Sequence, residues 1–291
     1  MRKYFIINYL LIISSAILVF FQCSSRKIEL QSAQSQNVGF LIEQAKLFFE
    51  QRIDSSSVFK ANHFLGLANN IEKDNFELSN LYSRSLFFQG LFLENDKIKK
   101  DSLFLKGAEI AKYSVLNDSL FKSILNKTIG DSSFKILSAL SIAPIELVPG
   151  MYWWATNKLW YLNNKPAIER VNHRELLEII MHRIISIEPD YFYGGPYRFF
   201  GIFYSRIPGV EITQAKSYFE KAINSYPNYF GNKVQMSAFY HQKAENRNLF
   251  TSQLQSVINI DPTLNPDIIP ENIFYQKRAA YLLNQEQTLF E

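Results

Sequence analysis

The stretch that decides the fold is Ile187–Tyr204, with the sequence IEPDYFYGGPYRFFGIFY. Its first proline is typical of a helix end, and the two glycines with the second proline are typical of a turn that opens the next helix. Two similar helix ends follow, SYPNYF at Ser225–Phe230 and INIDPTL at Ile258–Leu264. The prolines that mark these three ends are 38 and 35 residues apart. This spacing lies in the range of helical-hairpin repeats.

The clearest repeat unit is Ala215–Pro227. Its Ala215, Phe219, Ala222 and Pro227 place small, aromatic, small and proline residues at relative positions 0, 4, 7 and 12. This is the signature of the second helix of a tetratricopeptide repeat. A single unit cannot bury its apolar face alone, so stacking of units must supply the core. We therefore predict an all-α fold, a tetratricopeptide-like helical hairpin array (α-α superhelix), with repeats clearest in 167–262.

The rest of the chain also has helical periodicity. Apolar residues recur at helical spacing from Phe40 nearly to the end, and no sustained two-residue alternation predicts a strand. One long helix is expected over 167–187 and a closing helix over 271–284. Other helices are expected to begin at or near four aspartates: Asp54, Asp74, Asp101 and Asp131.

The first residues are typical of an export signal. A basic start, Met1-Arg2-Lys3, precedes an apolar run over Tyr4–Phe21, and the only cysteine, Cys23, follows it. We predict a lipoprotein signal peptide over 1–22, lipidated Cys23 with a flexible tether through residue 38, and a single domain over 39–291. The protein is then periplasmic and lipid-anchored to the inner or outer membrane. An uncleaved membrane anchor is the alternative, because about 18 apolar residues can span a bilayer.

Composition and motifs argue against several function classes. The whole chain carries 31 basic and 27 acidic residues, and without Arg2 and Lys3 the balance is 29 to 27. Such a balance does not favour a nucleic-acid partner, and the run Lys97–Lys100 is expected to be a solvated helix end. The four histidines lack zinc-site spacing, and no phosphate-loop, dinucleotide or serine-hydrolase motif is present. We expect no enzyme activity, no metal and no cofactor.

One family resemblance rests on YFYGGPYRFFGIFYSRIPG, at Tyr191–Gly209, together with the tryptophan-containing helix Met151–Trp160 and the repeat Ala215–Pro227. The chain resembles the periplasmic tetratricopeptide lipoproteins associated with TRAP transporters, the T-component family. The resemblance implies a non-enzymatic partner of the substrate-binding protein of a TRAP transporter, which binds or passes on a small organic-acid or hydrophobic solute. It also suggests a small homo-oligomer. The alternative is a tetratricopeptide scaffold in cell-envelope or outer-membrane assembly.

Arg198 is the most informative candidate for a ligand site. It is expected in the first turn of a helix that starts sharply at Gly194-Gly195-Pro196. There the helix dipole disfavours a cation by a few tenths of a kcal/mol to about 1 kcal/mol. An anion should compensate, either an Asp or Glu of the fold or the carboxylate of a ligand at the same helix end.

Aromatic residues near this turn are the other candidates. Tyr152, Trp153 and Trp154 are adjacent and cannot all face one direction on a helix, so at least one is expected to be partly exposed or to face a second surface. The ligand- or partner-binding residues that we predict are Tyr152, Trp153, Tyr191, Tyr193, Gly194, Gly195 and Arg198.

Overall fold

The computed structural model describes residues 37–291, which form helices joined by turns and loops and contain no strand in that range. The expectations for the signal peptide, Cys23 and the tether up to residue 36 lie outside the described residues. Residues 37 and 38, assigned above to the tether, instead belong to a helix over residues 37–50. Val38 is buried there against Ala45 and Leu65, which explains why the helix includes it.

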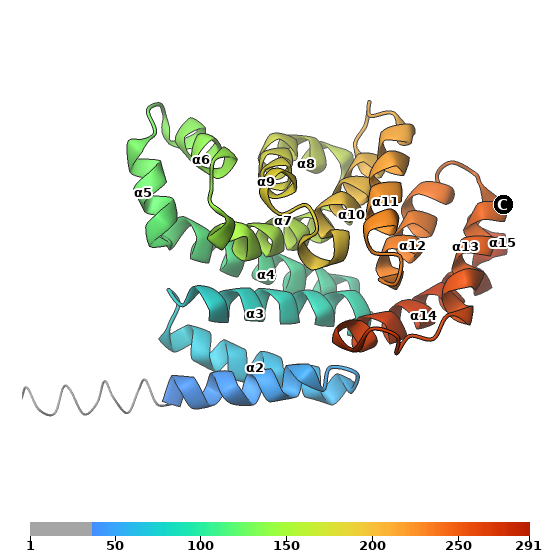
Figure 1. The fold of residues 1–291 in the computed structure, drawn as a ribbon, viewed down its shortest axis with the longest axis horizontal. Helices are drawn as coiled ribbons and strands as arrows, with labels where there is room; N and C mark the ends of the chain where they lie inside the picture. The colour runs from blue at the N-terminus through green and yellow to red at the C-terminus, as the bar shows by residue number, and fades with distance from the viewer. Residues whose placement is uncertain (1–36) are drawn as a thin grey trace, which may run out of the picture.

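The helices follow one another as hairpins stacked along a curved array (Figure 1). After the helix over residues 37–50, the elements are α2 (Ser55–Ile71), α3 (Phe76–Phe88), η1 (Gln89–Leu93), α4 (Lys97–Asn117), α5 (Ser119–Lys127), α6 (Ser132–Ser141), η2 (Ile145–Leu147), α7 (Val148–Leu162), α8 (Ala167–Asn172), α9 (Arg174–Ile187), α10 (Tyr191–Arg206), α11 (Ile212–Ser225), α12 (Phe230–Met236), η3 (Ser237–His241), α13 (Arg247–Asn259), η4 (Pro266–Ile268), α14 (Ile269–Asn284) and α15 (Glu286–Leu289).

Acidic and amide side chains cap several of these helices. Asp54 and Asp131 accept hydrogen bonds from backbone N–H groups of α2 and α6, as the sequence predicts. The cap of α3 is Asn75, one residue after the expected Asp74. Asp96 accepts from the backbone N–H of Lys99 at 2.8 Å, and α4 therefore starts four residues before the expected Asp101.

Helix α7 is the centre of the molecule. It packs against α3, α4, α9 and α10. Tyr152, Trp153 and Trp154 are accordingly all buried, with exposed fractions of 2%, 2% and 3%. None of these three side chains is exposed. They face different neighbouring helices instead, with Trp153 against Phe87 of α3 and Tyr152 against Tyr191 of α10.

The predicted helix over 167–187 is two helices that meet at His173. Arg170 explains the break. Its guanidinium donates to the carbonyls of Leu162 and Lys165, at 3.1 and 2.7 Å, and thereby holds the short α8 across the end of α7. These bonds satisfy carbonyl groups that a helix end leaves without partners.

The hairpin α10–α11 has the packing that the sequence pattern predicts. Ala215, Phe219 and Ala222 are fully buried. The ring of Phe219 lies against Gly201, where an added Cβ would come within 2.7 Å of it. The glycine thus lets the two helices approach closely, which supports the interpretation of this unit as a helical-hairpin repeat.

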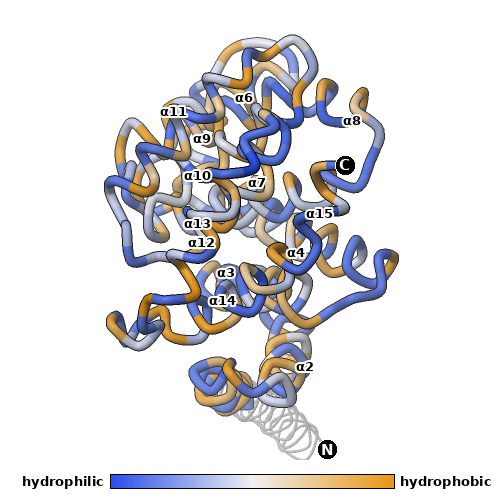
Figure 2. Tube along the Cα trace, turned by 90° about the vertical axis from the view of Figure 1, so that its right-hand side faces the viewer, coloured by the Kyte–Doolittle hydropathy of each residue, from blue (hydrophilic) through white to orange (hydrophobic). Residues whose placement is uncertain are grey.

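The last helices return to the beginning of the described chain. Helix α14 lies beside the end of α3 and the turn between the helix over residues 37–50 and α2 (Figure 1). Phe274 of α14 stacks on Phe92 at 5.2 Å and meets Phe88 edge-on at 5.4 Å. Hydrophobic and hydrophilic residues alternate in short runs along the helices (Figure 2), as expected for amphipathic helices in a stacked array.

Among residues 37–291, no single helix has the length and apolar character needed to cross a membrane. Ser132–Ser141 and Ile145–Leu162 together meet those criteria, but their axes bend by 106°.

Candidate functional site

The segment that joins α9 to α10 has an unusual backbone. Phe192, Tyr193 and Gly194 are all left-handed, with φ of 47°, 59° and 70°. Such conformations cost residues with a Cβ of order 1–3 kcal/mol each and persist only where the surroundings hold them. The regular helix starts after this turn, at the Gly-Pro step that the sequence marks as a helix start.

Arg198 holds this turn from inside the molecule. Its guanidinium donates to the backbone carbonyls of Phe192 at 3.2 Å and Tyr193 at 3.1 Å. It also donates to Oδ1 of Asn232 at 2.7 Å and to the phenol oxygen of Tyr152 at 3.2 Å. Only 5% of Arg198 is exposed. The side chain therefore links α7, the left-handed turn and α12.

Neutral groups surround the charge of Arg198. None of the ion pairs within residues 37–291 includes it. Its guanidinium carbon lies 4.6 Å from the centre of the Tyr229 ring, a cation–π contact. Burial raises the pKa of Tyr229 well above its usual value, so this phenol stays neutral. The prediction that an Asp or Glu neutralises Arg198 is wrong, because carbonyl, amide and phenol dipoles with an aromatic face stabilise the cation.

A small polar cavity adjoins this cation. Its volume is only about 10 Å³, roughly the space of one water molecule. Thr156 and Gln235 also line it. Their buried Oγ1 and Oε1 atoms have no hydrogen-bond partner in the described part of the chain. The cavity therefore offers polar contacts beside Arg198 but is too small for an organic solute.

The other predicted residues gather around the same turn. Tyr191 meets the ring of Tyr152 edge-on at 5.0 Å, and Tyr193 stacks on Tyr229 at 5.2 Å. Burial raises the pKa of both Tyr191 and Tyr193. The left-handed turn thus packs these two tyrosines against Tyr152 and Tyr229, the two rings that contact Arg198.

The remaining three predicted residues allow close approach or fill the core. At Gly195 an added Cβ would overlap the phenol of Tyr152, so the glycine gives this phenol access to Arg198. At Gly194 a Cβ would lie 3.3 Å from the backbone of Ala222. Trp153 is buried between Phe87 and Phe192, with ring centres 5.5 and 4.8 Å away.

Comparison with known protein families decides the identity of this architecture. The profile of the TRAP transporter T-component family matches residues 93–290. The chain belongs to that family. A search of curated proteins finds no match. Membership associates the chain with TRAP transporters, as the sequence resemblance implied, and the matched range includes Arg198 and the whole left-handed turn.

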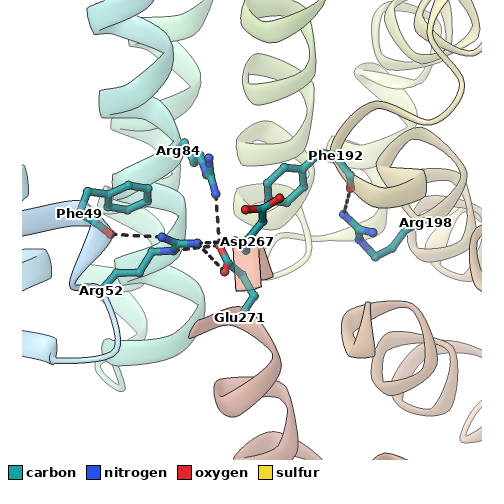
Figure 3. A network of polar contacts seen from close by, with 7 residues as sticks. All are labelled: Phe49, Arg52, Arg84, Phe192, Arg198, Asp267 and Glu271. Carbon is teal, nitrogen blue, oxygen red and sulfur yellow. Dashed lines mark hydrogen bonds and ion pairs between the residues drawn. The ribbon is translucent and has the colours of Figure 1, made fainter. Parts of the chain in front are cut away.

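This member of the T-component family has a second polar cluster that sequence reasoning missed. Arg52 and Arg84 both donate to the buried carboxylate of Glu271, and Arg52 does so through two nitrogens, at 3.1 and 2.8 Å (Figure 3). The ring of Phe192 lies between Arg84 and Arg198, with the guanidinium carbons 5.1 and 5.8 Å from its centre. The cluster therefore joins the first hairpin and α14 to the left-handed turn.

A larger cleft in this T-component chain was also not predicted. It has a volume of about 670 Å³ and lies between α4, α7, the end of α10, and α14. Four cations line it, and we call it the basic cleft: Lys100, Arg206, Lys277 and Arg278. Within residues 37–291, no group of three or more His, Cys, Asp or Glu residues is placed to hold a metal ion.

The basic cleft and the Arg198 cavity share a wall. Trp160, Gln235 and Tyr275 line both spaces. The Nε2 of Gln235 donates to the phenol oxygen of Tyr275 at 2.8 Å. Two π-helical segments, η1 and η3, also border the basic cleft, through Phe92 and Phe239 among others. Such segments occur frequently at functional sites.

Proposed function

We propose that this chain is a non-enzymatic periplasmic lipoprotein that partners the substrate-binding protein of a TRAP transporter. In this role it binds or passes on a small organic-acid or hydrophobic solute. The observation that carries the proposal is the family match over 93–290, which includes Arg198 and all residues that line the basic cleft except Leu91 and Phe92.

The shape and lining of the basic cleft support a solute-handling role. Pockets for small ligands commonly have volumes of about 300–1,000 Å³ and combine aromatic walls with a few placed polar groups. The basic cleft, at about 670 Å³, lies within that range and contains both kinds of residue. The Arg198 cavity is too small for a solute, and we propose that Arg198 instead fixes the wall that the two spaces share.

Capture from the source cells tests the proposed partner. The full chain with a C-terminal affinity tag is expressed in these cells, cross-linked before lysis, purified in detergent and identified with its partners by mass spectrometry. Recovery of a TRAP substrate-binding protein is the expected result. Recovery of outer-membrane assembly or envelope scaffold proteins in its place would contradict the proposal and favour the adaptor alternative.

A further inference from the structure

The basic cleft is lined by cations and, in the described part of the chain, by no acid. No Asp or Glu of the described chain is among the residues that line the cleft. None of its four cations takes part in an ion pair within residues 37–291. Three of them pack instead against aromatic rings, with Arg206 5.4 Å from Phe239, Lys277 5.0 Å from Phe274 and Arg278 5.1 Å from Tyr281.

The walls of the basic cleft withdraw these cations from water in part. Desolvation lowers the pKa of Arg278 and of Arg206, although both side chains reach solvent. Desolvation and the charge of Arg278 both lower the pKa of Lys100, against the opposite influence of Glu94 and Asp101. A bound anion would relieve the repulsion between Lys100 and Arg278 and would replace the lost hydration.

Aromatic rings form part of the lining of the basic cleft. Trp160 of α7 and Phe239 of η3 meet edge-on at 5.9 Å. Phe92 and Phe274 stack nearby at 5.2 Å. These rings belong to four different elements and form an aromatic surface next to the cations. A ligand that matches both features has an acidic head and an apolar body.

We infer that the basic cleft binds an amphipathic organic anion, with its carboxylate or phosphate head near Lys100 and Arg278 and its apolar body against Trp160 and Phe239. The inference rests on the proposed function for its biological role, since it names the chemical class of the solute. Binding of the anion itself does not depend on the proposed function, because this chain supplies both the cations and the aromatic surface without a partner protein.

Photoaffinity labelling of the full chain tests the inference without any partner protein. The chain is reconstituted in lipid nanodiscs and labelled with decanoate that carries a diazirine at the end of its chain, and the labelled peptides are mapped by mass spectrometry. We expect labels in α7, η3 and α14. Unlabelled decanoate should suppress them, and decanol should not. Suppression by decyl phosphate would show that the head site accepts phosphate, and its absence would restrict the site to carboxylates.

Variants of the cleft residues test whether the cations cause the labelling. Arg278→Gln and Lys100→Gln should each weaken labelling of the basic cleft by roughly tenfold, the loss expected for one charge-assisted hydrogen bond. Lys99→Gln, one residue away in α4 but outside the cleft lining, should leave it unchanged. Equal competition by decanol, or unchanged labelling in both cleft variants, would overturn the inference. Such a result would leave the capture of a substrate-binding protein unaffected. The labelling experiment therefore tests the ligand, and the capture experiment tests the partner.

Discussion

Arg52 and Glu271 are 219 residues apart in the sequence and form a buried ion pair with two hydrogen bonds. Arg52 also donates to the backbone carbonyl of Asp267 at 3.1 Å, just before α14. The pair therefore closes the helical array by fastening its last long helix to the turn after its first described helix. Since Arg84 shares the same carboxylate and faces Phe192, the closure also supports the left-handed turn.

Loss of the shared carboxylate should loosen this closure. Glu271→Gln leaves Arg52 and Arg84 without a counter-ion, and breaking a buried pair in this way typically costs about 3–5 kcal/mol. We expect faster amide hydrogen exchange in the helix over residues 37–50 and in α2, measured by mass spectrometry. The matched control is Glu286→Gln, which removes an exposed pair with Arg247 and should have little effect. Exchange that is equal in the two variants would contradict this role.

Replacement of Arg198 tests whether its hydrogen bonds hold the left-handed turn. Arg198→Met removes the donor for four oxygen atoms, two of which belong to the left-handed turn. We expect the free energy of unfolding to fall by roughly 2–4 kcal/mol in chemical denaturation. The control Arg174→Met breaks a partly exposed pair with Glu178 and should cost less than about 1 kcal/mol. Similar losses in both variants would mean that Arg198 does not hold the turn.

The backbone strain at Gly194 can be separated from its packing. Gly194→Ala adds a Cβ at a φ of 70° and places it 3.3 Å from the backbone of Ala222. Gly209→Ala has a similar φ of 79° but open space around the Cβ. We expect a loss of about 1 kcal/mol for Gly209→Ala and a larger loss for Gly194→Ala. Thermal unfolding that gives equal losses would show that the approach to Ala222 contributes nothing.

His241 should make stability depend on pH. Burial lowers the pKa of His241 below its usual 6.5, although the hydrogen bond with Gln253 acts in the opposite direction. The unfolded chain then binds a proton more readily than the folded chain, so stability falls as the pH drops through about 6.5. His241→Gln should reduce this loss between pH 7.5 and 5.5 in denaturant titrations. An unchanged loss in the variant would exclude His241 as its source.

Local features of the fold were predictable from the sequence because they depend on residues close in the chain. Asp54 and Asp131 cap the helices that follow them by accepting hydrogen bonds from backbone N–H groups two or three residues away. The hairpin signature of Ala215, Phe219 and Ala222 needs only helical spacing, and the structure buries all three. The Gly-Gly-Pro turn was predicted for the same reason, but not its left-handed Phe192 and Tyr193, since most L-residues rarely adopt that conformation.

The candidate site was less predictable because long-range packing assembles it. Arg198 was selected from its helix position, but its partners Tyr152 and Asn232 lie 46 and 34 residues away. The basic cleft takes its cations from positions 100, 206, 277 and 278, so no run of charges marks it. The run Lys97–Lys100 forms an exposed helix end as predicted, but the sequence did not show that Lys100 also lines that cleft.

We propose above all that this chain binds the substrate-binding protein of a TRAP transporter. The most direct test titrates the purified binding protein of the source cell onto the full chain in lipid nanodiscs and follows the complex by interferometry, with and without solute. We predict saturable binding at a single class of sites. Absence of saturable binding in both conditions, with a chain that retains its helical circular dichroism, would contradict the claim.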